Sequence, residues 1–442
     1  MSKYIESKEA IDTSLLLWDI RPTQTSVQET YDIVVYPTAI YDDQYGGPIT
    51  FVIPPQSSGC LINIDVITEW RVMKGENKKI VAADQVTVIN NFSNALWSYV
   101  DVQVGDRINV MQSMENAYAY QTLFNTIFNN QSNRKDYLFE SESFVMDTGM
   151  SKEEANCLVF TNNNEKLVKN KGSSTRAARI AGSRILTSKT KLHTSLLTHS
   201  KVLPTEMRIK VTLAKNKNSF ILMASTTDFK VLVQKVFLQC TFVRPRDFVI
   251  NLQDERLKQD PALYDVEYPE ISMRSISAGK TQVTINDLFP NKLPKVAFFA
   301  LQTSSDLVGD FGTTPFCFNR MRSFQLYVNN HEYFPFPIKF VENEVTKDDF
   351  SQAYMQLYKA LGLEMKGDCL INAVNFNIYY ILGVILTPDK EHVKHLNLQR
   401  EAEVRAEITL EVASESAFTL ITYALYDRLY TIDHNRQLSI IE

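Results

Sequence analysis

Two stretches of the chain share one pattern of apolar and polar positions. In residues 86–128, Val100, Val102 and Val104 alternate with polar residues, which predicts a half-buried strand that ends at Gly105. After a short polar link, apolar residues recur at helical spacing and predict an amphipathic helix with one buried face, made of Ala117, Tyr120, Leu123, Phe124 and Ile127. This stretch therefore reads as strand, turn and helix.

Residues 316–361 repeat this plan. Phe324, Leu326 and Val328 alternate with polar or amphipathic residues, and Asn329-Asn330 supplies the turn. A second helical face follows, made of Phe350, Ala353, Tyr354, Leu357 and Leu361. The repetition indicates that the chain is a duplication of one structural unit.

Strand patterns fill most of the remaining chain. Alternation at 207–213 predicts a strand, and the long strand at 229–243 slips in phase near Gln234-Lys235, which predicts a bulge. Residues 404–412 alternate most regularly, and we expect them to form a hairpin with a return strand at 418–426. Short strands, one helix per half and no strand-helix alternation predict an all-β fold of two tandem jelly-roll sandwiches, each with a short helix.

The predicted boundaries follow changes in composition. Residues 1–28 read as an N-terminal arm containing Trp18, residues 29–250 as the first jelly roll, and residues 251–442 as the second, with the junction marked by Pro245 and the polar segment 253–260. Phe128 and Met207 are 79 positions apart, whereas Leu361 and Val404 are 43 apart, so the first unit holds 36 extra residues there. We expect residues 129–206 to be loop with some strand.

Composition limits the class of protein. At 442 residues with 44% hydrophobic and 22% charged positions, the chain suits two folded domains, and no apolar run is long enough for a signal peptide or a membrane helix. The five cysteines are scattered and lack CxxC spacing, which favours a reducing environment. A net charge of -5 argues against a dedicated nucleic-acid binder, so any such contact is expected to be local.

One segment is strongly basic. Between 166 and 191 the chain has eight basic residues and no acidic residue, namely Lys166, Lys169, Lys171, Arg176, Arg179, Arg184, Lys189 and Lys191. These side chains are candidates for neutralising the phosphates of packaged nucleic acid, a contact that would be sensitive to salt and blind to sequence. A solvated loop, or pairing with acidic residues of a neighbouring subunit, explains the same pattern.

Candidate catalytic motifs are weak. Gly279-Lys280-Thr281 has Arg274 where a phosphate-binding loop needs its first glycine, so we expect an ordinary turn. His392 and His395 have the spacing of two metal ligands on a helical turn, and Asp389 or Glu391 could supply a third. Such a pair is more often part of a solvated loop or helix end, so we expect no metal site here. We therefore predict no catalytic, metal or cofactor site, no cofactor and no enzymatic activity.

Seven segments, in order along the chain, resemble the major capsid proteins of Polinton/Maverick elements and the related adintoviruses. They are PTQTSV at 22–27, VTVINNFSNALWSYVDVQVG at 86–105, AYAYQTLF at 117–124, KVLPTEMRIKVTLAKNKNSFILM at 201–223, GDFGTTPFCFN at 309–319, LTPD at 386–389 and YDRLYTIDHNR at 426–436. None of these segments is a catalytic signature. The resemblance covers nearly the whole chain, which departs from the family in having few long insertions.

The resemblance implies a double jelly-roll protein whose homotrimers tile an icosahedral shell around double-stranded DNA. It implies that the protein is made in a host cell and is located in the virion. The implied partners are further copies of the chain, penton or minor capsid proteins and, through local contacts, packaged DNA. Insertion into a membrane is not implied. Two alternatives stay open. One is a carbohydrate- or peptide-processing enzyme on paired jelly rolls, which needs a cleft with perturbed carboxylates or metal ligands. The other is a minor capsid component, which would be a single jelly roll.

Overall fold

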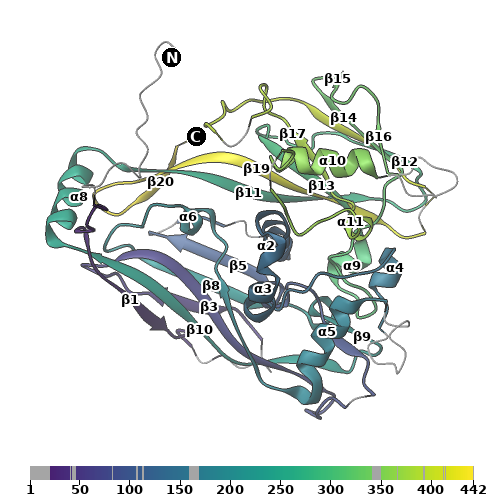
Figure 1. Cartoon of the computed structure of the whole chain (residues 1–442), viewed down its shortest axis with the longest axis horizontal. Coiled ribbons are helices and arrows are strands. Elements are labelled where there is room, and N and C mark those ends of the chain that lie inside the picture. The colour runs from purple at the N-terminus through teal and green to yellow at the C-terminus, as the bar shows by residue number, and fades with distance from the viewer. Residues whose placement is uncertain are drawn as a thin grey trace.

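The computed structural model describes residues 20–39, 41, 46–81, 83–105, 108–111, 114–158, 169–340, 350–365, 367–391, 394–411, 413 and 415–441. Residues 1–19 of the predicted arm, Trp18 included, lie outside this description, and so do Lys166 and His392. Within it, two β-sandwiches lie one above the other in the view of Figure 1.

Two antiparallel four-stranded sheets make up the first sandwich. Sheet I has the strand order β1-β10-β3-β7, formed by Val27–Val35, Phe229–Pro245, Cys60–Lys74 and Leu186–Lys191. Sheet II has the order β2-β8-β5-β6, formed by Ile49–Ile53, Ile209–Lys215, Trp97–Val104 and Ile108–Asn109. A short pair, β4 (Val86–Val88) and β9 (Leu222–Ala224), lies beside them.

The second sandwich repeats this arrangement. Sheet III has the order β11-β19-β13-β17, formed by Ala262–Ile276, Phe418–Ile432, Val296–Thr303 and Leu382–Ile385, and β20 (Leu438–Ile441) pairs with β19. Sheet IV has the order β12-β18-β14-β15, formed by Gln282–Ile285, Val404–Thr409, Ser323–Val328 and His331–Glu332, and β16 (Ile338–Lys339) pairs with β14.

The strand order is the same in both sandwiches. In each, the first strand in sequence pairs with a long strand near the end of the unit (β1 with β10, β11 with β19), that long strand pairs with the third strand, and the second strand lies at the edge of the opposite sheet. This order is a jelly roll, so the predicted fold class of two tandem jelly rolls is confirmed. The duplication seen in the sequence is present in the topology.

The two stretches that suggested the duplication form the predicted elements. In the first, β5 and a turn at Gly105 lead to α2 (Ala117–Asn129), and in the second, β14 leads to α10 (Ser351–Ala360). α10 lies directly against β17, where a Cβ at Gly383 would be 2.5 Å from the Cβ of Ala360. The predicted bulge in β10 is also confirmed, because the pairing with β3 shifts register between Val233 and Lys235.

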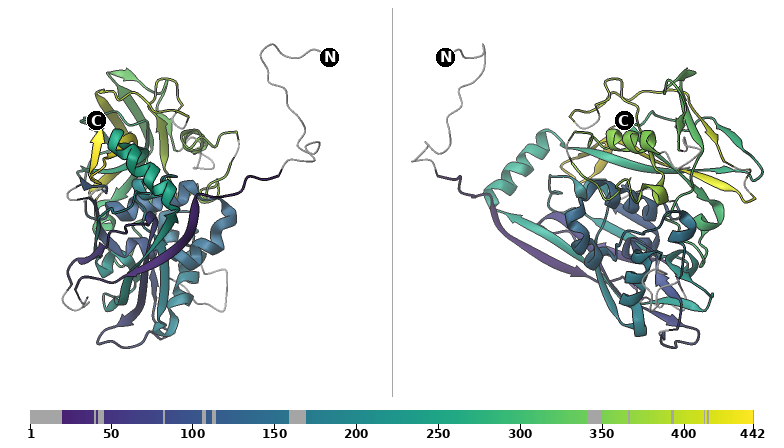
Figure 2. Two further views of the ribbon diagram at one scale, coloured as in Figure 1. Left: turned by 90° about the vertical axis from the view of Figure 1, so that its left-hand side faces the viewer. Right: turned by 45° about the vertical axis from the view of Figure 1, so that its right-hand side comes forward.

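Further helices lie in several of the connections between strands. They are α1 (Phe92–Ala95), α3 (Lys135–Glu142), α4 (Lys152–Ala155), α5 (Lys171–Ile180), α6 (Ser195–Thr198), α7 (Asn218–Ile221), α8 (Asp247–Gln259), α9 (Ser304–Val308) and α11 (Phe376–Tyr379). α8 joins β10 to β11 at one end of the molecule, and Figure 2 shows it passing from one sandwich to the other. The polar segment at 253–260, which the sequence marked as the expected junction, is mostly helical.

Two expectations about local structure are wrong. Residues 404–409 and 418–432 do not form a hairpin, because β18 pairs with β12 and β14 in sheet IV, whereas β19 pairs with β11, β13 and β20 in sheet III. The alternation identified both strands, but their partners are distant in sequence. The region 129–206 was expected to be loop with some strand, and its described part contains α3, α4, α5, α6 and β7.

Candidate functional site

The basic segment does not form one continuous surface. Of its eight residues Lys166 lies outside the described chain, Lys169 precedes α5, and the other six are spread over α5, the turn after it and β7. α5 begins at Lys171 because the side chain of Asn170 accepts a hydrogen bond from the Ser173 backbone N–H at 3.1 Å. The residues therefore divide into a helical group and a strand group.

The prediction that the Arg176 side chain is available to bind phosphate is wrong. Its side chain is fully buried, and Nη2 lies 2.6 Å from Asp147 Oδ1. Nε donates to the carbonyl of Val88 at 2.9 Å, and Nη1 donates to that of Val145 at 2.6 Å. The guanidinium joins three segments of the first sandwich, so Arg176 is a structural residue that solvent and ligands do not reach.

Three other basic residues have acidic partners. Lys169 Nζ lies 3.1 Å from Glu154 Oε1, and Lys189 Nζ lies 3.2 Å from Asp65 Oδ2. Arg179 lies over the ring of Phe139 at 4.6 Å, and its Nη2 is 3.2 Å from Glu140 Oε2. Lys171, Arg184 and Lys191 are exposed. Of the predicted cluster, these three side chains present their charge most freely.

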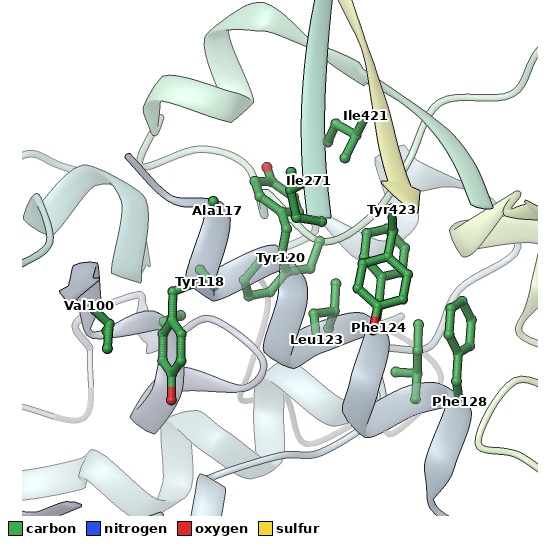
Figure 3. Close-up of a cluster of buried hydrophobic side chains, with 14 of the residues drawn as sticks. Val100, Ala117, Tyr118, Tyr120, Leu123, Phe124, Phe128, Ile271, Ile421 and Tyr423 are labelled. Carbon is green, nitrogen blue, oxygen red and sulfur yellow. The ribbon is translucent and has the colours of Figure 1, made fainter. Parts of the chain in front are cut away.

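α2 forms the layer between the two sandwiches. The Phe124 ring stacks on Tyr423 of β19 at 5.2 Å between centroids, and the Phe128 ring lies 4.5 Å from Phe298 of β13. Figure 3 shows Phe124 and Phe128 extending from the helix, with Phe124 beside Tyr423. Every residue of α2 is buried except Asn125 and Asn129, because one side of the helix contacts its own sandwich and the other contacts the second.

A buried lysine adds a polar connection between the halves that the sequence reasoning missed. Lys152 of α4 places Nζ 2.6 Å from Asp306 Oδ2 and 2.6 Å from Asn319 Oδ1, and it also donates to Gln302. Burial lowers the pKa of Lys152, while Asp306 opposes that shift. The sequence carries no signal for this contact, because 154 residues separate Lys152 from Asp306.

A second buried pair lies beneath α2. Glu142 accepts hydrogen bonds from Thr126 Oγ1 and Asn94 Nδ2, each at 3.2 Å, and burial raises its pKa to about 7. His193 Nε2 lies 4.0 Å from Glu142 Oε1, and burial lowers the pKa of His193 to about 4. Perturbed carboxylates are typical of catalytic clefts, but this one is only 7% exposed and its oxygens bind structural donors.

The weak motifs lead to no catalytic arrangement among the described residues. Gly279 adopts a positive φ of 81° between β11 and β12, as expected for an ordinary turn. His395 Nε2 lies 3.0 Å from Asp389 Oδ2 at the surface, and His392 lies outside the described chain. In the part of the chain that the structure covers, no group of three His, Cys, Asp or Glu side chains is placed to hold a metal ion.

Sequence comparison finds one significant relative. No family model matches the chain. An uncharacterised protein of Caenorhabditis elegans is 24% identical over 257 residues, which cover 54% of this chain and 59% of that protein. The match thus spans about three fifths of the relative's length.

Solved structures share the whole fold. A chain of the Sputnik virophage, from cryo-electron microscopy, aligns with a TM-score of 0.63 at 12% identity over 100% of this chain and 94% of that chain. The mavirus major capsid protein aligns with a TM-score of 0.56 at 11% identity over 100% and 96%, and the Faustovirus major capsid protein with 0.57 at 8% over 93% and 92%. The class defined by this fold is the double jelly roll found in viral major capsid proteins.

None of the described helices is long and apolar enough to cross a membrane.

The features that the fold brings together are connections between the two sandwiches: the aromatic layer on α2, the buried Lys152 and the helix α8 that joins β10 to β11. Their chemistry holds two jelly rolls in one arrangement.

Proposed function

We propose that the chain is a major capsid protein of a double-stranded DNA virus or virus-like element of the Polinton/Maverick and adintovirus kind. The observation that carries the proposal is the identical strand order of the two sandwiches, together with full-length likeness to viral capsid chains. The seven segments that resemble Polinton and adintovirus capsid proteins support the narrower assignment, and so does a relative from an animal.

The proposed working unit is a homotrimer with six jelly rolls. Two similar sandwiches per chain give a trimer of pseudo-hexagonal outline, because three copies present six similar sides, and such a unit can tile an icosahedral shell around DNA. Residues 29–250 and 251–442 would be the two units, although the boundary between them falls inside α8. The protein would work through interfaces rather than catalysis, in the virion, after synthesis in a host cell.

Further partners follow from a capsid role. Penton or minor capsid proteins would fill positions that a pseudo-hexagonal unit cannot occupy, and the arm at 1–28 would tie neighbouring trimers together. Exposed Lys171 and Arg184 are the proposed sites of local, non-specific contact with packaged DNA. A shell that closes at normal yield without residues 1–26, which precede β1, would contradict the role of the arm.

Expression of the full chain followed by negative-stain imaging tests the function. Hexagonal particles, or closed shells that form from them, are the expected result. Particles of monomer size under all conditions of salt and concentration would contradict it. An enzyme on paired jelly rolls would instead show itself as a monomer that turns over a glycan or peptide substrate.

A further inference from the structure

Lys152 belongs to a cluster of polar side chains that joins the two halves of the chain. The residue lies on α4 in the first half, and its Nζ is 2.6 Å from Asn319 Oδ1 and 2.6 Å from Asp306 Oδ2 in the second half. Figure 1 shows α4 beside α9, the helix that carries Asp306. The side chains of Lys152 and Asp306 are only 10% and 5% exposed. An amine, an amide and a carboxylate are therefore held together with little access for water.

Hydrogen bonds fix the carboxylate and the amide independently of the lysine. Asp306 Oδ1 accepts from Thr313 Oγ1 at 2.8 Å, and Asp306 Oδ2 accepts from Thr303 Oγ1. The backbone N–H of Asn319 donates to the carbonyl of Leu301 at 2.7 Å, which fixes the segment that carries the amide. Groups held in place in this way react as parts of one molecule and do not have to meet by diffusion.

The amide carbon of Asn319 is within reach of the lysine nitrogen. Nζ is 2.6 Å from Oδ1, and a C=O bond is about 1.23 Å long, so Nζ is at most about 3.8 Å from the Cγ of Asn319. Reacting atoms in a near-attack arrangement are about 3–3.5 Å apart. A small movement of the lysine side chain is therefore enough to bring Nζ to the carbon.

We propose that Lys152 and Asn319 form an isopeptide bond that links the two jelly rolls covalently. Asp306 takes a proton from the lysine ammonium, and the neutral amine attacks the Cγ of Asn319. The bond from Nζ to Cγ forms, and the bond from Cγ to Nδ2 breaks. The leaving nitrogen receives one proton from the attacking amine and one from Asp306, so it departs as ammonium and Asp306 returns to its carboxylate form. The step needs no other reactant.

Burial favours the neutral amine that this step requires. It lowers the pKa of Lys152, although the carboxylate of Asp306 opposes the shift. Lys189 has a similar set of partners, with Asp65 at 3.2 Å and the amide oxygen of Gln239 at 2.9 Å, but its side chain is 50% exposed. Because water solvates that ammonium, Lys189 stays unlinked and provides a control within the same chain.

The amide of Gln302 is a competing target, since Lys152 also donates to it. The Gln302 nitrogen donates to the carbonyls of Pro315 at 2.8 Å and Cys317 at 3.2 Å, and Gln302 is fully buried. Loss of that nitrogen would break both hydrogen bonds inside the fold. Asn319 is only half-buried, so its leaving nitrogen can reach solvent. The structure therefore favours Asn319 as the partner of Lys152.

The bond would join residues that are 167 positions apart in the sequence. A cross-link of this length restricts the unfolded chain, and it keeps the two jelly rolls joined when the fold opens. The inference is independent of the proposed capsid function, because it depends only on contacts within one chain.

Mass spectrometry of the purified full chain, after denaturation, tests the proposal. We expect an intact mass lower than that of the sequence by one molecule of ammonia. After proteolysis we expect a branched peptide in which Lys152 is joined to Asn319, whereas Lys189 and Gln239 should appear only in linear peptides. A wild-type chain without the branched peptide, or with Lys152 joined to Gln302 or Asp306, would overturn the proposal.

Two substitutions separate the reacting lysine from the residue that assists it. Lys152→Arg removes the nucleophile, and Asp306→Asn removes the proton acceptor while Lys152 and Asn319 remain. Both variants should have the full mass and lack the branched peptide, and Lys189→Arg should retain the link. Circular dichroism shows whether each variant is folded, and the wild-type spectrum decides the question even if one is not. A folded Asp306→Asn variant that is linked as completely as the wild type would contradict the proposed step.

Discussion

Arg176 Nη2 lies 2.6 Å from Asp147 Oδ1, and both side chains are completely removed from solvent. Arg176 belongs to the segment that looked from its sequence like a basic surface, whereas Asp147 precedes that segment. The position of Arg176 shows that a run of positive residues can contain a structural residue whose charge is neutralised inside the fold. The stability of the fold is therefore expected to depend on both members of the pair.

Removing one member of this pair leaves an uncompensated buried charge. We expect Arg176→Met or Asp147→Leu to lower the free energy of unfolding by about 3–5 kcal/mol. The double variant should recover much of that loss, because no charge remains buried. Denaturant titration measures all three, and Arg184→Met at an exposed position is the control, expected to change stability by less than about 0.5 kcal/mol. Equal stability of wild type and Arg176→Met would show that the ion pair does not form.

Glu142 predicts a dependence of stability on pH. Its pKa is raised from 4.5 to about 7 in the folded protein, so the stabilisation associated with its protonated form is present below pH 4.5 and lost as the pH rises through 7. The ionised form costs about 3 kcal/mol at pH 8. Glu142→Gln should therefore be more stable than wild type at pH 8, and the difference should vanish near pH 4.5. Thermal unfolding across this range measures it, and a constant difference would contradict the raised pKa.

The contribution of His193 to stability changes with pH in the opposite direction to that of Glu142. Its pKa is lowered from 6.5 to about 4 by burial, so its contribution to stability is present above pH 6.5 and declines as the pH falls toward 4. In Glu142→Gln this decline should appear alone, as a loss of stability between pH 6.5 and 4. A proton titration of the His193 ring by NMR checks the assignment, and an ordinary pKa near 6.5 would refute it.

The aromatic layer should couple the two sandwiches. Phe128→Ala removes a buried ring that contacts Phe298, and we expect a loss of about 3–5 kcal/mol in the free energy of unfolding. Tyr137→Ala, at an exposed position on α3, is the control and should have little effect. If Phe128→Ala unfolded in two separate transitions, the layer would be shown to make the two sandwiches one cooperative unit.

Local DNA contact is tested through its salt dependence. Replacing Lys171 and Arg184 with alanine removes two exposed charges, and the slope of log affinity against log salt concentration should become shallower by about 1.8 for double-stranded DNA. Lys189→Ala should leave the slope unchanged if that residue contacts a neighbouring subunit. An unchanged slope in the first variant would favour a solvated segment.

The sequence predicted the parts of the fold whose signal is local. Alternation at Val100–Val104 and the helical face from Ala117 to Ile127 identified β5 and α2, and their repetition identified the duplication. The strand at 404–409 was also identified, but its partners were not, because alternation reports a buried face and says nothing about the neighbouring strand. α5 and α8 were missed because polar helices at junctions lack a strong apolar period.

The candidate site could be predicted only in outline. Charge counting found the basic segment, but it could not tell buried Arg176 from exposed Arg184, since burial depends on Val88, Val145 and Asp147 far along the chain. No sequence pattern indicated that Lys152 contacts Asp306 in the second half of the chain. Contacts of this kind appear only when distant segments are placed in space.

Light scattering coupled to size-exclusion chromatography, on the full chain at several concentrations, tests the central claim most directly. The account predicts a dominant species of about three times the chain mass of 50.6 kDa, which further assembles into shells. A single species at 50.6 kDa at every concentration would contradict it.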